Sequence, residues 1–108
     1  DRKIKEIEGQ RLLSRLSDND FVVALAIEGR KLSSTEFAQK LANWEVSSGS
    51  RITFIIGGSI GLCKEVIRRA NYLLSFSDMT FPHQLMRVIL CEQIYRSYRI
   101  RNNEPYHK

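Results

Sequence analysis

The chain has 108 residues, of which 43% are hydrophobic and 27% charged, and it carries a formal net charge of +5 at pH 7. This length fits one domain with one packed core, and the hydrophobic content is too high for a disordered chain. No apolar run approaches the roughly 20 residues that cross a bilayer, and the charged start does not resemble a signal peptide. We therefore expect a cytoplasmic protein without a membrane partner. The basic net charge favours binding to an anionic partner.

The first predicted element is an amphipathic helix over residues 5–16, because its apolar side chains fall largely on one side. These side chains are Ile7, Leu12, Leu13 and Leu16. The chain begins at Asp1, inside this charged, helix-forming run, so we expect a further segment upstream. The continuous apolar run FVVALAI, residues 21–27, then predicts a strand that is covered on both faces, as in a parallel sheet.

Strand and helix signals alternate through the middle of the chain. Ser33 and Glu36 match a capping box, which predicts the start of a second helix. The apolar run ITFII, residues 52–56, predicts a second buried strand, and YLLSF, residues 72–76, a third. Leu62, Val66, Ile67 and Ala70 are the apolar residues of a short helix predicted between these two strands.

The last predicted helix begins near Pro82, which suits a first helical turn because its missing N–H would be unbonded there anyway. The helix runs to about Ile100. Its apolar residues cover a wide arc, so we expect it to be buried on more than one side, with part of that arc covered in a symmetric dimer.

This alternation predicts an α/β fold with a mostly parallel sheet, in a single domain over residues 1–108. In such sheets, ligands bind beyond the carboxyl ends of the strands. Three segments are expected there: residues 28–31, 57–61 and 77–81.

The glycine-rich segment GGSIG, residues 57–61, lies between a predicted strand and a predicted helix. Glycine allows the backbone to approach a ligand closely and to present N–H groups at a helix start. The spacing is not GxGxxG and no GK[ST] follows, so neither the dinucleotide nor the P-loop fingerprint is present. A tight structural turn and a ligand-binding loop are equally good interpretations of this pattern alone.

The isolated cysteines and histidines give little support to metal binding, disulfide formation or hydrolysis. Cys63 and Cys91 have no CxxC spacing, so no metal site and no disulfide scaffold is predicted. His83 and His107 have no nucleophile and acidic partner at a readable spacing, so hydrolysis has no support and a structural role is the simpler interpretation of His83.

The C-terminal end is basic and aromatic. Such a surface can hold phosphates and stack on bases. A solvated helix end explains the same composition, because Arg side chains near a helix C-terminus interact favourably with the helix dipole. The residues concerned are Tyr95, Arg96, Tyr98, Arg99, Arg101 and Tyr106.

Several motifs in fixed order resemble the ribosomal RNA large-subunit methyltransferase H family, a branch of the SPOUT class. The motifs are EGQRLL (8–13), LAIEGRKLSS (25–34), FIIGGSIGL (54–62), LSFSDMTFPHQLMRVILCEQIYRSYRI (74–100) and EPYHK (104–108). The resemblance covers essentially the whole chain, but family members are longer, with a strand, a helix and a strand ahead of the residues seen here.

The resemblance implies an α/β fold with a C-terminal trefoil knot, a homodimer, and transfer of a methyl group from S-adenosylmethionine to N3 of a pseudouridine in large-subunit ribosomal RNA. It implies no metal. The position of Asp78 is permissive in the family pattern, which argues against a chemical role for its carboxylate. The residues that the resemblance places around the cofactor are Leu25, Gly57, Gly58, Phe76, Ser77, Asp78, Met79, Thr80 and Phe81.

The same resemblance assigns an RNA-facing role to the C-terminal end. His107 is the nearest candidate for a general base that removes the N3 proton, a role that water or RNA could also fill. The alternative function is a catalytically silent RNA-binding or ribosome-assembly module of the same fold, while the PHQLMR and PYHK motifs argue against a transfer RNA substrate. The residues expected to bind RNA are Arg96, Arg99, Arg101, Tyr106, His107 and Lys108.

Overall fold

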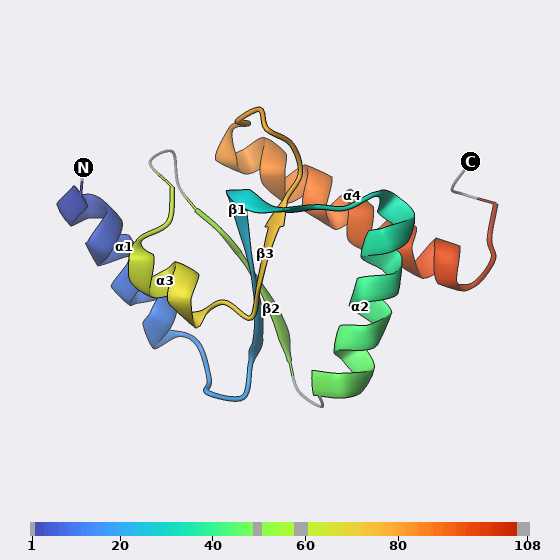
Figure 1. Ribbon diagram of the computed structural model, residues 1–108, viewed down its shortest axis with the longest axis horizontal. Coiled ribbons are helices and arrows are strands. Elements are labelled where there is room, and N and C mark those ends of the chain that lie inside the picture. The colour runs from blue at the N-terminus through green and yellow to red at the C-terminus, as the bar shows by residue number, and fades with distance from the viewer. Residues whose placement is uncertain (1, 49–50, 58–60, 106–108) are drawn as a thin grey trace.

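The structure is a computed structural model that describes residues 2–48, 51–57 and 61–105. A parallel sheet with strand order β2-β1-β3 lies between two pairs of helices (Figure 1), which confirms the predicted α/β architecture. The strands are β1 (Phe21–Lys31), β2 (Ile52–Ile56) and β3 (Tyr72–Ser75). The helices are α1 (Arg2–Ser14), α2 (Ser34–Ser48), α3 (Lys64–Arg69) and α4 (His83–Arg101).

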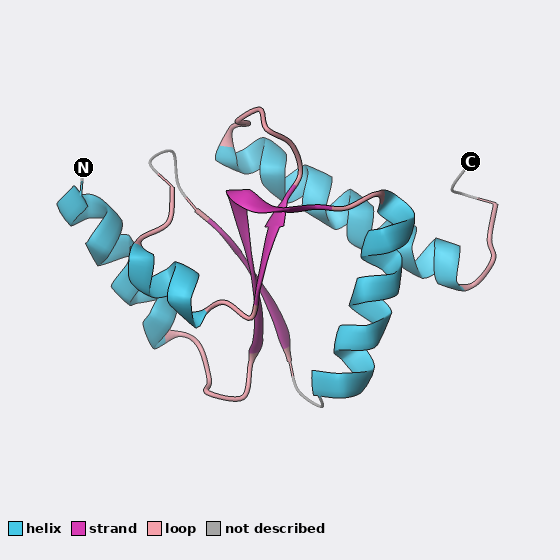
Figure 2. Cartoon of the chain, viewed as in Figure 1, coloured by secondary structure: helices cyan, strands magenta, loops and turns pink. Residues whose placement is uncertain are grey.

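The central strand β1 is covered on both faces, as its continuous apolar run predicts. Val23 and Leu25 point into one cluster with Phe37, Leu41 and Trp44 of α2. The alternate residues of β1 point to the opposite face, where α1 and α3 lie (Figure 2). Two cores therefore sandwich the sheet and fix the positions of its strand ends.

The predicted capping box starts α2. The backbone N–H of Ser33 donates to Glu36 Oε1 over 2.8 Å, and the backbone N–H of Glu36 donates to Ser33 Oγ over 3.1 Å. These bonds satisfy two N–H groups that the helix itself leaves without a partner. The other predicted elements are also present, with ends shifted by a few residues.

One prediction of a loop is wrong: residues 28–31 belong to β1, which continues to Lys31. Both Leu25 and Arg30 pair with Leu74 of β3, so residues 26–29 form a bulge between two points of pairing. A Cβ atom at Gly29 would lie 2.6 Å from the carbonyl carbon of Leu73. Only glycine therefore allows the two backbones to approach so closely here.

The apolar side of the first predicted helix packs largely as expected, with Ile7 as the exception. Leu12 and Leu13 contact the core as expected, but Ile7 is 48% exposed. The buried residue of α1 is Gly9, where a Cβ atom would lie 2.1 Å from Cys63 Sγ. The missing side chain lets the helix lie directly against the segment that precedes α3.

Within the chain, helix α4 is buried along the side that faces α2, and burial of its other side in a dimer stays a prediction. It packs beside α2 (Figure 1), and its fully buried residues are Leu90 and Ser97. Its outward face exposes Leu85, Val88 and Tyr95, and Val88 is 64% exposed. Within residues 2–48, 51–57 and 61–105, no helix has the length and hydropathy of a membrane span.

At the amino ends of the strands, a buried carboxylate joins three segments. Arg51 donates to both Asp20 oxygens, over 3.2 and 2.8 Å, and the backbone N–H of Ser17 donates to Asp20 Oδ2 over 3.0 Å. Arg69 donates to the carbonyl oxygens of Ser17 and Asp20. The Arg51 guanidinium, followed by the Ser17 N–H, lowers the pKa of Asp20.

We expect Asp20→Asn to lower the melting temperature at pH 7. Because the folded-state pKa of Asp20 lies below its unfolded value of about 3.9, its stabilising effect is complete above that value and disappears as the pH falls through the folded pKa. The melting temperatures of wild type and variant should therefore begin to converge below about pH 4 and meet only below the folded pKa. The exposed neighbour Asp18, changed to Asn, is the control; an equal effect of both changes at pH 7 would contradict the assignment.

Candidate functional site

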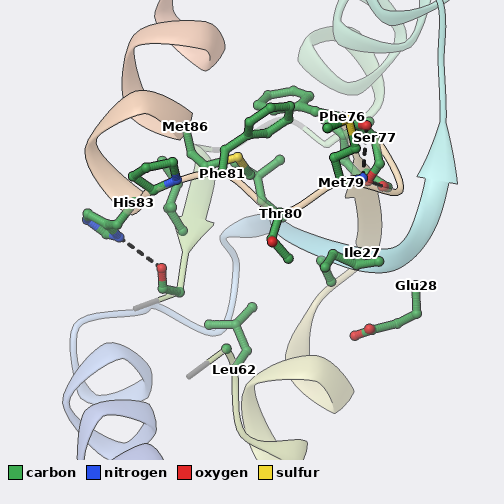
Figure 3. A pocket seen from close by; sticks show the side chains of 18 of the residues that line it. Ile27, Glu28, Leu62, Phe76, Ser77, Met79, Thr80, Phe81, His83 and Met86 are labelled. Atoms are coloured by element: carbon green, nitrogen blue, oxygen red, sulfur yellow. Dashed lines mark hydrogen bonds between the residues drawn. The ribbon is translucent and has the colours of Figure 1, made fainter. Parts of the chain in front are cut away.

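The carboxyl ends of the three strands open onto a cleft of about 800 Å³ (Figure 3). Its walls come from the bulge of β1, from the residues that follow β2, and from the loop between β3 and α4, as the rule for parallel sheets predicts. Helices α1, α3 and α4 complete it. The lining residues are Lys5, Leu25, Ala26, Ile27, Glu28, Ile56, Gly57, Gly61, Leu62, Ile67, Leu74, Ser75, Phe76, Ser77, Met79, Thr80, Phe81, Pro82, His83 and Met86.

The structure brings most of the predicted cofactor residues together around this cleft, although they come from three separate parts of the chain. Their role in binding stays a prediction, because their common position shows proximity and not occupancy. The predicted residues that line the cleft are Leu25, Gly57, Phe76, Ser77, Met79, Thr80 and Phe81.

Asp78 is the described member of the predicted set that does not line the cleft. Its carboxylate pairs with Lys31 Nζ over 2.6 Å, and its side chain is 81% exposed. Two bonds shape the loop around it: Ser75 Oγ donates to the Ser77 carbonyl, and the Met79 N–H donates to Ser77 Oγ, each over 3.0 Å. The carboxylate thus forms an exposed ion pair with the last residue of β1 and does not line the cleft.

Several cleft residues were not predicted. Leu62 directly follows the predicted segment 57–61, and Met86 lies in the first turn of α4, so a search a few residues beyond each predicted loop would have found both. Lys5 could not be found in this way, because its position depends on how α1 docks through Gly9. His83 lies at one end of the cleft, and its ring points toward the Gly57 carbonyl (Figure 3).

The composition of the cleft suits an organic ligand with an extended apolar part. Aliphatic and aromatic side chains form much of the wall, while hydroxyl groups of Ser77 and Thr80 and the charged Lys5 and Glu28 add polar positions. A volume of this size falls within the usual range of small-molecule sites. Among the residues described, no three His, Cys, Asp or Glu side chains gather in an arrangement that could hold a metal ion.

The three arginines predicted to bind RNA all lie on the C-terminal half of α4, and each pairs with a carboxylate. Arg96 pairs with Glu92 over 3.1 Å, and Arg99 with Glu104 over 2.9 Å. These are partly exposed pairs of the kind that contributes little to stability.

Arg101, unlike the other two arginines, pairs with a carboxylate of another helix, Glu45 of α2. Its Nη1 donates to Glu45 Oε1 over 2.7 Å, and its guanidinium stacks on the Tyr98 ring at 4.1 Å from the centroid. The Tyr98 hydroxyl donates to the other oxygen of Glu45. The bond from Arg101, then that from Tyr98, lowers the pKa of Glu45, and this cluster joins the ends of α2 and α4.

Four of the predicted site residues lie outside the residues that the structure describes. They are Gly58, Tyr106, His107 and Lys108. The proposed base and the tail therefore stay predictions.

Nearly the whole chain is similar to a known protein family. A family described as "Predicted SPOUT methyltransferase" matches residues 1–107. The chain belongs to the SPOUT methyltransferase family. The match extends over every element that forms the cleft.

Curated relatives within this SPOUT family carry a more specific name. A protein of Bifidobacterium animalis subsp. lactis, named ribosomal RNA large subunit methyltransferase H, is 59% identical over 106 residues, which is 98% of this chain and 67% of that protein. A protein of the same name from Clostridioides difficile is 57% identical over 105 residues, 97% of this chain and 66% of that protein. The chain thus spans about two thirds of the length of these relatives.

Proposed function

We propose that this chain carries the cofactor site of a methyltransferase that transfers a methyl group from S-adenosylmethionine to N3 of a pseudouridine in large-subunit ribosomal RNA. The observation that carries the proposal is the identity of 59% with a relative named for large-subunit ribosomal RNA methylation. Seven residues expected to surround the cofactor, from three separate segments, also line one cleft.

The cleft fits S-adenosylmethionine in size and in chemistry. Phe76 and Phe81 offer apolar surface for a flat heterocycle, and backbone groups that follow the strand ends offer donors and acceptors for its polar edges. Lys5 and Glu28 offer opposite charges, which suits the carboxylate and the ammonium group of a methionine moiety. We therefore assign binding mainly to backbone contacts and apolar packing.

S-adenosylmethionine supplies, when bound, a methyl group on a positively charged sulfur. The task of the chain is to hold the ligand and the RNA base so that the base nitrogen lies in line with that group, because alignment lowers the barrier to transfer. Apolar residues such as Leu25 and Phe81 keep water away from the cleft walls. His107 is the proposed acceptor of the N3 proton.

RNA binding is assigned to the C-terminal end of the chain. Arg96, Arg99 and Arg101 can donate to phosphate oxygens, although each now holds a carboxylate, so phosphate must compete with that carboxylate or use other N–H groups of the guanidinium. Tyr106, His107 and Lys108 complete the proposed surface. Binding should weaken with increasing salt, as for other phosphate contacts.

We also propose a homodimer that covers the outer face of α4. Leu85 and Val88 lie about one helical turn apart on that face and are 45% and 64% exposed. Tyr95 follows two turns further on and is 50% exposed. A contiguous apolar face of this kind is typical of interaction sites. The trefoil knot and the cytoplasmic location stay predictions of the family resemblance.

Calorimetric titration with S-adenosylmethionine, beside an assay on ribosomes from a strain that lacks the modification, tests the proposal. We expect saturable binding together with methyl transfer. Binding of the cofactor without transfer to any ribosomal particle would favour the silent assembly module. Absence of binding would refute the assignment of the cleft.

A further inference from the structure

A single hydrogen bond joins two loops of the cleft that lie far apart in the sequence. His83 Nδ1 lies 2.8 Å from the carbonyl oxygen of Gly57, 26 residues earlier (Figure 3). Both residues line the cleft. Gly57 follows β2, and His83 is the first residue of α4.

The Gly57 carbonyl takes this partner beyond the end of the sheet. The last pair of the β1–β2 ladder joins Leu25 and Ile56, so no strand neighbour is paired with Gly57. The bond is exposed to solvent, so what His83 adds is a partner of fixed position in place of water. Because a carbonyl oxygen can only accept, His83 Nδ1 must carry the hydrogen, which leaves Nε2 as the unprotonated nitrogen of the neutral ring.

The bond fixes the distance between the two loops at this end of the cleft. Gly57 is already packed tightly, since a Cβ atom there would lie 2.9 Å from Leu62 Cδ2. Helix α4 is itself tied to α2, because Ser34 Oγ donates to Gln93 Oε1 over 2.7 Å. The His83 ring therefore bridges the residue after β2 and the first residue of α4.

We propose that His83 is a positioning residue that holds the Gly57 carbonyl through its Nδ1–H group and thereby sets the shape of the cofactor cleft. The proposal rests on the proposed function for the identity of the ligand. It assigns no contact between His83 and the reacting atoms. It does require one tautomer of the ring, which a residue that only fills space would not.

Ligand affinity tests the positioning role. S-adenosylhomocysteine, titrated calorimetrically, should bind about fivefold more weakly to His83→Ala than to wild type, as expected for loss of one neutral hydrogen bond. His83→Asn should bind nearly as wild type, because its amide nitrogen can take the place of Nδ1. Gln84→Ala, an exposed change in the same helical turn, is the matched control and should have no effect.

The tautomer provides a second readout that does not depend on the ligand. Nitrogen NMR of the ligand-free wild type at pH 8 should show His83 protonated on Nδ1, whereas a histidine in water prefers Nε2. A ring protonated on Nε2 would overturn the proposal, and so would a His83→Ala variant that binds as tightly as wild type. Wild type that fails to bind S-adenosylhomocysteine would refute the proposed function and the cofactor role of His83 with it, while the tautomer would still decide whether the bond exists.

Discussion

Replacing Gly57 with valine should reduce the affinity for S-adenosylmethionine by about 100-fold, the loss expected from a steric conflict at a tightly packed site. A Cβ atom at this position would lie 2.9 Å from Leu62 Cδ2 and 3.1 Å from the carbonyl carbon of Gly61. The remaining atoms of valine would take up space in the cleft or move the loop. Calorimetry measures the affinity, and thermal unfolding shows whether the variant still folds cooperatively.

A second variant distinguishes the two causes of such a loss. Gly57→Val combined with Leu62→Ala removes the side-chain atoms that a new Cβ atom would meet, and Leu62→Ala alone is the control because Leu62 also lines the cleft. Affinity restored in this double variant would assign the loss to displacement of Leu62, and affinity that stays low would assign it to space needed by the ligand. An unchanged dissociation constant for Gly57→Val would contradict the placement of the cofactor in this cleft.

Deleting Tyr106, His107 and Lys108 should lower methylation of ribosomes by about 100-fold or more, the range in which a general base contributes. The affinity for S-adenosylmethionine should change little, because the cleft is lined by residues from Lys5 to Met86 and the tail is assigned to the substrate. Initial rates of methyl transfer and calorimetric titration measure the two effects separately.

Substitution of His107 by alanine alone is the companion to this deletion. A rate as low as that of the deletion would support His107 as the base, and an intermediate rate would assign part of the effect to RNA binding by the other two residues. Wild-type rates for the deletion variant would show that the tail has no catalytic role. A loss of cofactor affinity would instead make the tail part of the cofactor site.

Local signals in the sequence were sufficient for most of the fold. Apolar runs of strand length predicted all three strands, and β1, which is central in the order β2-β1-β3, is covered on both faces as a central parallel strand must be. Ser33 and Glu36 predicted the start of α2, because capping depends on residues only three positions apart. The rule for parallel sheets then predicted which loops meet, and Gly57 and Phe81 do line one cleft.

Features that depend on distant contacts could not be predicted in this way. The segment EGRK, residues 28–31, has no strand pattern, and it becomes part of β1 because β3 lies beside it. Asp78 pairs with Lys31, a residue 47 positions earlier in the chain, and does not line the cleft. The bond between His83 and Gly57 likewise needs both loops in place, so the isolated histidine pattern carried no sign of it.

The bulge of β1 has a consequence for how a ligand can reach the cleft. Residues 26–29 form one wall, and β3 clamps this wall on both sides, since Leu74 pairs with Leu25 before the bulge and with Arg30 after it. The wall can swing outward only if the ladder with β3 breaks, which links its opening to the stability of the sheet itself. A ligand in the cleft therefore meets this wall in one fixed position for as long as the pairing with β3 is intact.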